Sequence, residues 1–318
     1  VSRLKKAYSK NGVKGLISKK RDKPSNRKYP DSVKELALAY IRRFYADFKP
    51  TFACEKLREN HDLSVSNETL RKWMIEAEIW IPRTQRLRRA YQPRNRRESF
   101  GELIQIDGSP HDWFEGRDSK CTLLVYIDDA TGKLMDCQFV KSESTFTYFD
   151  STRRYLQKYG KPVAFYSDKH SVFRVNKKEA LGGDGVTQFG RALSDLNIDI
   201  ICANTPQAKG RVERVNRTLQ DRLIKEMRLM GISNAEQGND FLPEFITKFN
   251  EKFSKKPVNS KDMHREILSH EDMDEIFSWQ ETRTLSKDLT LQYDKVLYMI
   301  EDSPNNRPLA RNKVTVYE

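Results

Sequence analysis

Apolar positions recur at helical spacing in the segment that follows residue 30. The stretch Ser32-Val33-Lys34-Glu35 has the form of a capping box, and apolar residues then repeat every three or four positions. We expect this helix to end near Phe48, before Pro50. A second, shorter helix is predicted over Phe52–Glu59.

A third helix is predicted to begin after Ser66, whose hydroxyl can cap its first turn. Val65 and Leu70 stand where a hydrophobic staple would pack, and Leu70 and Trp73 should face the other helices. The residues left on the outer surface, able to enter a major groove, are Asn67, Arg71 and Lys72. Two helices, a tight turn and a capped basic helix form the outline of a helix-turn-helix module, although small helical bundles also serve many other ends.

From residue 103 the pattern changes to short β-rich runs, after which helical and strand-like segments alternate. In chain order we predict strands over 103–107, 121–128 and 134–140, a helix over 145–159, a strand over 163–167, a helix over 188–196, a strand over 198–202, and helices over 210–230 and 242–253. Three meandering strands followed by alternating helix and strand predict an α/β core, a mixed sheet with helices on its faces. This is the ribonuclease-H-like order of elements.

The end of the chain returns to strand-like alternation. Segments 290–293, 296–300 and 314–317 alternate around turns at Asp294-Lys295 and Pro304-Asn305-Asn306, which predicts a small all-β C-terminal domain. The chain is therefore expected to be multidomain, with a basic segment (1–30), a helix-turn-helix N-terminal domain (31–82), a linker (83–100), the α/β core (101–275) and the β domain (276–318). We expect the basic segment to end a DNA-binding region that begins upstream of Val1, and the β domain to continue past residue 318.

Positive charge is concentrated in two stretches that flank the predicted helices. The chain of 318 residues has a formal charge of +13, yet residues 1–30 and 81–100 carry so much Lys and Arg that the remainder sums to −3. A single basic run is often a solvated linker, but two runs around a helical module favour a polyanionic partner. The linker arginines expected to contact DNA phosphates or the minor groove are Arg88, Arg89, Arg94 and Arg96.

Other classes of protein are disfavoured by the same sequence. The four cysteines form no Cys-x-x-Cys pair and no cluster with histidine at zinc spacing, which favours reduced core cysteines. No window approaches 18 consecutive apolar residues, and no charged start precedes an apolar run. We therefore expect a soluble, cytoplasmic protein with no membrane partner.

Two aspartates close predicted strands. Asp107 ends the strand over 103–107 and is followed by Gly108, so its carboxylate should project from the rim of the sheet. Asp168 follows the strand over 163–167 in the same manner. Either residue alone is more typical of a turn after a strand.

Glu213 lies in the first turn of the long helix predicted from Gly210. The apolar face of that helix consists of Val212, Val215, Leu219 and Leu223. The separate polar stripe that carries Glu213 also holds Asn216, Arg217 and Gln220. By itself a carboxylate at this place is typical of a helix start favoured by the macrodipole.

Taken together, these sites resemble the Asp-Asp-Glu core of retroviral integrases and bacterial insertion-sequence transposases, and the ISNCY group is the most similar. The segments that carry the resemblance are Ile106-Asp107-Gly108, Tyr166-Ser167-Asp168-Lys169-His170 and Pro206–Arg214. The segment 52–73 is also similar to the family's helix-turn-helix, and the tail after Trp279 to its C-terminal β domain. The resemblance implies a transposase with Asp107, Asp168 and Glu213 as catalytic residues and metal ligands.

The implied chemistry suits these residue types. Hard Mg²⁺ or Mn²⁺ ions take oxygen ligands, and two ions can clamp the attacking and leaving oxygens of a phosphoryl displacement. The resemblance implies strand cleavage at the element's ends and then attack of the freed 3′-hydroxyl on target DNA. Its partners would be double-stranded DNA, as terminal inverted repeats and target, within a homo-oligomer at the bacterial nucleoid. Lys209 and Arg217, on either side of Glu213, are further candidates for DNA contact.

Two features depart from the retroviral pattern. The second Asp and the Glu are separated by 44 residues, more than in retroviral integrases, and we place the excess within 174–187. The zinc-binding domain that opens retroviral integrases is absent from this sequence. An inserted surface loop would leave the rim geometry intact, but it weakens any residue-level analogy for the loop before the Glu213 helix.

Other residues and other functions compete for the same roles. Four further acids lie beside turn residues, and we favour a structural role for each of them: Asp112, Glu115, Asp128 and Asp129. His170, two residues after Asp168, could contact phosphate, but for a single histidine we favour a role without function in the site. Two alternative functions stay open, a ribonuclease-H-like nuclease without joining activity and a non-catalytic DNA-binding protein derived from a transposase. The basic linker argues against the first, and the three carboxylates argue against the second.

Overall fold

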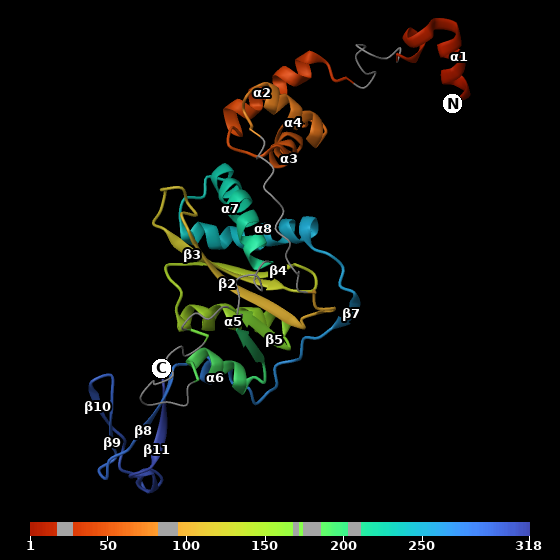
Figure 1. The fold of residues 1–318 in the computed structure, drawn as a ribbon. Helices are drawn as coiled ribbons and strands as arrows, with labels where there is room; N and C mark the ends of the chain where they lie inside the picture. The colour runs from red at the N-terminus through yellow and green to blue at the C-terminus, as the bar shows by residue number, and fades with distance from the viewer. Residues whose placement is uncertain (18–27, 82–94, 168–171, 174–185, 203–210) are drawn as a thin grey trace. The chain divides into compact units, whose positions relative to one another are not determined.

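The computed structural model describes residues 1–17, 28–81, 95–167, 172–173, 186–202 and 211–318 (Figure 1). The chain divides into two compact units, Val1–Ala90 and Tyr91–Glu318. None of the helices described in either unit is both long and apolar enough to cross a membrane.

The first unit is helical. Its basic helix α1 (Ser2–Asn11) and the short helix η1 (Gly12–Leu16) bury none of their residues. The helices α2 (Asp31–Phe44), α3 (Pro50–His61) and α4 (Asn67–Glu76) share one apolar core. The three helices predicted from apolar spacing are therefore confirmed, within a few residues at each end.

Each of α2, α3 and α4 contributes fully buried apolar residues to the core of this unit, among them Ile41, Leu57 and Leu70. Ser66 caps α4 as predicted, because its Oγ accepts a hydrogen bond from the backbone N–H of Thr69 at 3.1 Å. A serine at this position satisfies one of the N–H groups that a helix start leaves without an intrahelical partner.

The bounds of α2 differ from the prediction. Its N-cap is Pro30, and no side chain caps it, so the capping box predicted at Ser32 is wrong. The fixed backbone of Pro30 (φ −55°, ψ 146°) already provides the extended residue from which a helix can start. The helix ends at Phe44 because the chain then turns inward to bury Tyr45 and Phe48, each only 2% exposed.

The second unit is built on a five-stranded mixed sheet with the order β4-β3-β2-β5-β6. The strands β2 (Leu103–His111), β3 (Cys121–Asp128) and β4 (Leu134–Val140) form an antiparallel meander. The strands β5 (Ala164–Ser167) and β6 (Asp199–Cys202) extend the sheet in parallel with β2. The mixed sheet predicted from the order of elements is confirmed.

Helices cover both faces of this sheet (Figure 1). On one face lie α5 (Thr145–Tyr159) and α6 (Gln188–Asp195), and on the other α7 (Val212–Leu229) and α8 (Ala235–Phe253). The strand residues that face them are Ile104, Ile106, Leu124 and Tyr126 on the first side and Leu123, Val125 and Ile127 on the second. Alternate residues of each strand thus belong to opposite cores, as the pleat of a strand requires.

The strand β2 is longer than predicted. The sequence placed its end at Asp107, but β2 stays paired with β3 as far as His111. On its other side β2 pairs with β5 only from Leu103 to Gln105. Pro110 cannot donate a ladder hydrogen bond, and it lies where β3 is the one described strand that pairs with β2.

Several small elements lie outside the central sheet and the helices that cover it. They are β1 (Ser99–Phe100) with β7 (Asn259–Asp262), the helices α9 (Met273–Ile276) and η3 (Arg307–Leu309), and the antiparallel pairs β8 (Gln280–Thr284) with β11 (Lys313–Tyr317) and β9 (Thr290–Tyr293) with β10 (Val296–Met299). Asp294 and Lys295 form the predicted turn with positive φ angles of 44° and 64°, as a tight hairpin requires. The sequence missed β8, since its residues are almost all polar and show no apolar alternation.

Two asparagines of α8 hydrogen-bond to the backbone of the edge strand β4. Asn250 accepts from the N–H of Leu134 and donates to its carbonyl oxygen, both at 2.8 Å. Asn239 does the same with Phe139, at 2.7 and 3.1 Å. The two side-chain amides therefore stand in for a neighbouring strand, so that α8 is hydrogen-bonded to the sheet as well as packed on it.

We expect Asn250→Ala to lower the free energy of unfolding by about 1–3 kcal/mol, because it leaves the N–H and C=O of Leu134 without partners. Urea denaturation followed by circular dichroism measures the change. The matched control is Glu251→Ala, an exposed neighbour on α8 that should change stability by less than about 0.5 kcal/mol. Equal unfolding midpoints for the two variants would contradict a structural role for the amide.

Candidate active site

Asp107 lies where β2 loses one of its two neighbours. The last residue pair between β2 and β5 is Gln105 with Tyr166, and Asp107 is two residues further along β2. On the other side Asp107 remains paired with Val125 of β3. The half-buried Asp107 is thus held by a continuous ladder on one side, while on the other side no residue that the structure describes pairs with its strand at this level.

The polar stripe of α7 packs along this segment of β2. Asn216 donates its Nδ2–H to Oδ2 of Asp107 at 2.8 Å, and Gln220 donates its Nε2–H to Oγ of Ser109 at 3.2 Å. Asp107 and Ser109 are two residues apart, so they share one face of the strand. Glu213 lies one helical turn before Asn216 on the same stripe and is exposed.

Asn216 also has an unused acceptor beside Asp107. Its side chain is 8% exposed, and its Oδ1 has no hydrogen-bond partner in the described part of the chain. A buried amide oxygen without a partner costs free energy unless a donor or a cation satisfies it. The sequence placed Asn216 on the polar stripe but gave it no role, and the Glu-x-x-Asn spacing on one helix face was the available signal.

A buried carboxylate fixes the start of α7. Asp129, 1% exposed, forms an ion pair with Arg211, the N-cap residue of α7. The same carboxylate accepts hydrogen bonds from Nε2 of Gln105 at 2.5 Å and from the backbone N–H of Arg97 at 2.8 Å. One side chain therefore connects β2, the segment before β1 and the helix turn that carries Glu213.

The acids proposed as structural have structural partners. Asp128 accepts hydrogen bonds from the N–H of Gly101 and from the N–H and hydroxyl of Thr131. Burial raises the pKa of Asp128 despite these bonds, which act in the opposite direction. Asp112 accepts from the N–H of Gly116 at 3.0 Å and so holds a turn.

Several predicted site residues lie outside the described residues: Asp168, Arg88, Arg89, Arg94, Lys209 and also His170. Of the remaining ones, Arg217 is exposed on α7, and Asn67 and Lys72 are exposed on α4. The Arg71 side chain already has partners within its own unit: it forms an ion pair of 3.3 Å with Glu68, and its guanidinium lies 5.3 Å from the ring centre of Trp80. Arg96 donates to the carbonyl oxygen of Ala130 at 3.1 Å.

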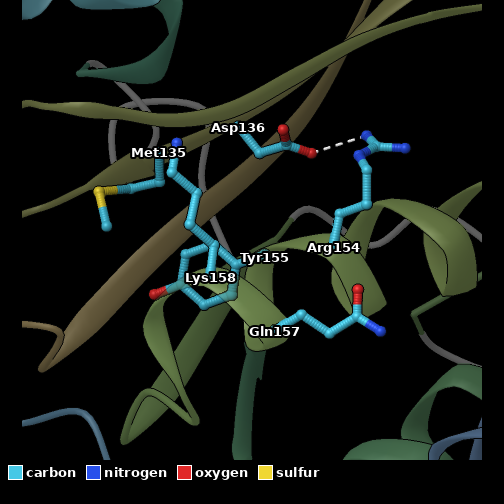
Figure 2. Close-up of a pocket in the computed structure, with 6 residues that line it drawn as sticks. All are labelled: Met135, Asp136, Arg154, Tyr155, Gln157 and Lys158. Carbon is cyan, nitrogen blue, oxygen red and sulfur yellow. Dashed lines mark hydrogen bonds and ion pairs between the residues drawn. The ribbon is translucent and has the colours of Figure 1, made fainter. Parts of the chain in front are cut away.

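A separate hollow of about 360 Å³ lies between β4 and α5 (Figure 2). Asp136 and Arg154 form an ion pair of 2.7 Å across it, and Lys158 and Gln157 extend from α5 beside them. Burial raises the pKa of Asp136, while Arg154 acts to lower it. This hollow belongs to the α5 side of β4, whereas Asp107 meets α7, so it is distinct from the candidate site.

Within the described ranges, no three Asp, Glu, His or Cys side chains lie close enough together to hold a metal ion. The structure does bring Asp107 together with the helix stripe that bears Glu213, through Asn216. The candidate DNA-binding residues are divided between the two units: Asn67, Arg71 and Lys72 are on α4 of the first unit, and Arg217 is on α7 of the second.

No protein-family model matches this chain. Two solved structures are similar in part: the catalytic core domain of HTLV-2 integrase in complex with magnesium, and the simian T-cell lymphotropic virus intasome in complex with the PP2A regulatory subunit B56 gamma. The first is 16% identical, with a TM-score of 0.37 over 48% of this chain and 89% of that one. The second is 13% identical, with a TM-score of 0.41 over 79% of this chain and 82% of that one.

Two curated relatives are transposases by name. The "Putative transposase y4bF" of Sinorhizobium fredii is 51% identical over 318 residues, which is 100% of this chain and 69% of that protein. The "Transposase for insertion sequence IS1202" of Streptococcus pneumoniae is 31% identical over 287 residues, 79% of this chain and 61% of that protein. Neither name mentions the ISNCY group, which stays a prediction. At 51% identity along its whole length, the chain belongs to the family of transposases that includes these two proteins.

Proposed function

We propose that this chain is the greater part of a DNA transposase that cuts DNA at the ends of its element and joins the freed 3′-hydroxyl to target DNA. Its catalytic carboxylates would be Asp107, Asp168 and Glu213. The observation that carries the proposal is the hydrogen bond from Asn216 to Asp107, since it fixes the polar stripe of α7 against β2. Glu213 stands one turn earlier on that stripe.

The placement of Asp168 in the sequence supports the same site. The strand β5 ends at Ser167, so Asp168 is the next residue along the chain. The register pairs Gln105 with Tyr166, and Asp107 and Asp168 each stand two positions beyond that pair in the sequence. In the sequence, the two carboxylates are therefore equally far beyond the last residue pair of two neighbouring strands, which suits a shared cation.

The donor set fits Mg²⁺ or Mn²⁺. Three carboxylates provide hard oxygen ligands, and the unpartnered Oδ1 of Asn216 beside Asp107 is a further oxygen that a cation or its water could satisfy. When bound, two such ions would lower the pKa of the attacking hydroxyl or water and stabilise the departing 3′-oxygen. The ligands would be Asp107, Asp168 and Glu213.

The chain's own residues would position these ligands. Asn216 restrains the Asp107 carboxylate by donating a hydrogen bond to its Oδ2. The Asp129–Arg211 ion pair fixes the first turn of α7 and, with it, the backbone of Glu213. Preorganised ligands of this kind need little rearrangement when the reaction occurs.

The remaining parts of the chain suit a protein that holds DNA. We propose that α3 and α4 form a helix-turn-helix, with exposed Asn67 and Lys72 reading or contacting DNA while Arg71 is oriented by Glu68 and Trp80. The linker arginines, with Lys209 and Arg217 near Glu213, would contact phosphates. The paired strands after Gln280 would form a small accessory β domain, and the protein would act as a homo-oligomer on its terminal repeats.

Single substitutions of the three carboxylates, Asp107→Asn, Asp168→Asn and Glu213→Gln, should each remove cleavage and joining in Mg²⁺ or Mn²⁺. They should leave binding to end DNA nearly unchanged, because metal ligands stabilise the transition state more than they add phosphate contacts. Cleavage and strand-transfer assays on labelled end DNA, with gel-shift titration in parallel, measure both properties.

The matched control for these variants is Asp150→Asn, an exposed carboxylate of α5 that should retain full activity. Near-normal joining by one of the three variants would remove that residue from the site. Cleavage without any joining in the unmodified protein would instead favour a nuclease, and no cleavage at all by the full-length protein would favour a non-catalytic DNA-binding protein.

Substituting Asn67 by Ala should reduce the preference for cognate end DNA over random DNA by roughly tenfold, because a lost base-edge contact costs about 1–3 kcal/mol of discrimination. Lys72→Ala should instead weaken binding to both DNAs alike, as loss of a phosphate contact does. Arg42→Ala, an exposed arginine on α2, serves as the control. Unchanged preference in Asn67→Ala would place end recognition outside α4.

A further inference from the structure

A fourth carboxylate lies against β2 next to Asp107. Glu143 precedes Ser144, which caps α5 by accepting from the N–H of Thr147 at 3.2 Å, so the backbone before the helix is fixed. The Glu143 carboxylate occupies the space of a missing side chain: a Cβ built on Gly108 would be 2.2 Å from its Cδ and 2.3 Å from its Oε1. Glycine at position 108 is what allows the carboxylate to reach the strand.

Tyr148 holds this carboxylate in place. Its hydroxyl donates to Oε2 of Glu143 at 2.7 Å. The ring of Tyr148 is fully buried and packs against Phe173 and Phe189, with ring centres 4.8 and 5.9 Å away. A donor that is itself held by the core restrains the Glu143 side chain, which is only half-buried.

No positive side chain neutralises Glu143 within the described residues, where its one hydrogen-bond partner is the Tyr148 hydroxyl. Burial, and then the charge of Glu143, raise the pKa of Tyr148 well above its ordinary value, and the charge of Asp107 acts in the same direction. The hydroxyl therefore stays protonated and remains a donor.

The two carboxylates approach the strand from opposite faces. Asp107 faces α7, where it meets Asn216, whereas the next residue, Gly108, faces the α5 side and Glu143. The strand β5 pairs with β2 only as far as Gln105, and both carboxylates border the part of this edge where no described residue pairs with β2. A carboxylate that has no counter-ion among the described residues and lies against the residue next to Asp107 favours a cation at this edge.

We propose that Glu143 is a fourth carboxylate of the active site, whose free oxygen helps to hold a divalent cation, directly or through water, at the open edge of β2. This inference rests on the proposed function, because it assigns Glu143 to the site of Asp107. Glu143 is a positioning residue in this scheme: it acts on DNA only through the cation that it helps to place. Its partners Gly108 and Tyr148 provide the space and the restraint.

The test uses the full chain and Mn²⁺ alone as the probe. Glu143→Gln keeps the shape and the bond to Tyr148 but removes the charge, and it should weaken Mn²⁺ binding in isothermal titration calorimetry roughly tenfold. The Mg²⁺ concentration for half-maximal cleavage should rise by a similar factor, and the melting temperature without metal should stay the same. Asp150→Asn, further along α5, should leave all three values unchanged.

Gly108→Ala provides an independent second variant, because its methyl group displaces the Glu143 carboxylate without removing the charge. Gly108→Ala should also weaken Mn²⁺ binding. If Glu143→Gln does not fold, the result for Gly108→Ala decides whether Glu143 helps to hold the cation. Unchanged Mn²⁺ binding in both variants would overturn the inference. This holds even if their melting temperatures fell, because Glu143 would then only support the position of Tyr148. The proposed function fails separately, if Asp107→Asn remains active.

Discussion

The unequal pairing of β2 is the constraint on which the rest of the site depends. One side of the strand is bonded to β3 over its whole length, while the other side is bonded to β5 for only three residue pairs. The long ladder supplies rigidity, and beyond the short one no described residue pairs with the backbone of β2. Asp107 and Gly108 lie in the stretch of β2 that is paired with β3 but is beyond the last pair with β5. A strand paired on both sides would bury them, and one paired on neither would not hold them still.

The helix α7 is positioned by two kinds of interaction that work together. Apolar residues such as Val212 and Leu219 bind it to the sheet, but such packing is not directional and permits small shifts along the axis. The bonds from Asn216 to Asp107 and from Arg211 to Asp129 set its register. Asp129 is almost fully buried, so leaving it unpaired would be costly, and this cost keeps Arg211 in place.

Much of the fold could be predicted from the sequence, because strong apolar periodicity marks its central elements. The bounds of β3, β4 and α5 match the prediction, and so does the cap at Ser66. The errors occur where tertiary contacts decide: β2 continues past Asp107 because β3 does, and the polar strand β8 exists only through its pairing with β11. For the candidate site, the sequence could predict only those residues that belong to a recognisable motif. Glu143 has no such signal, since its place depends on the empty space above a glycine 35 positions earlier.

The asparagines of α8 have a consequence for how copies of this chain could associate. Sheets commonly join by adding one molecule's outer strand to another's, which requires free backbone groups along an edge. Here Asn239 and Asn250 occupy such groups at both ends of β4. At the opposite border of the sheet β6 has only four residues. We therefore expect copies of this chain, where they associate, to meet through side chains and helices rather than through a continuous intermolecular sheet.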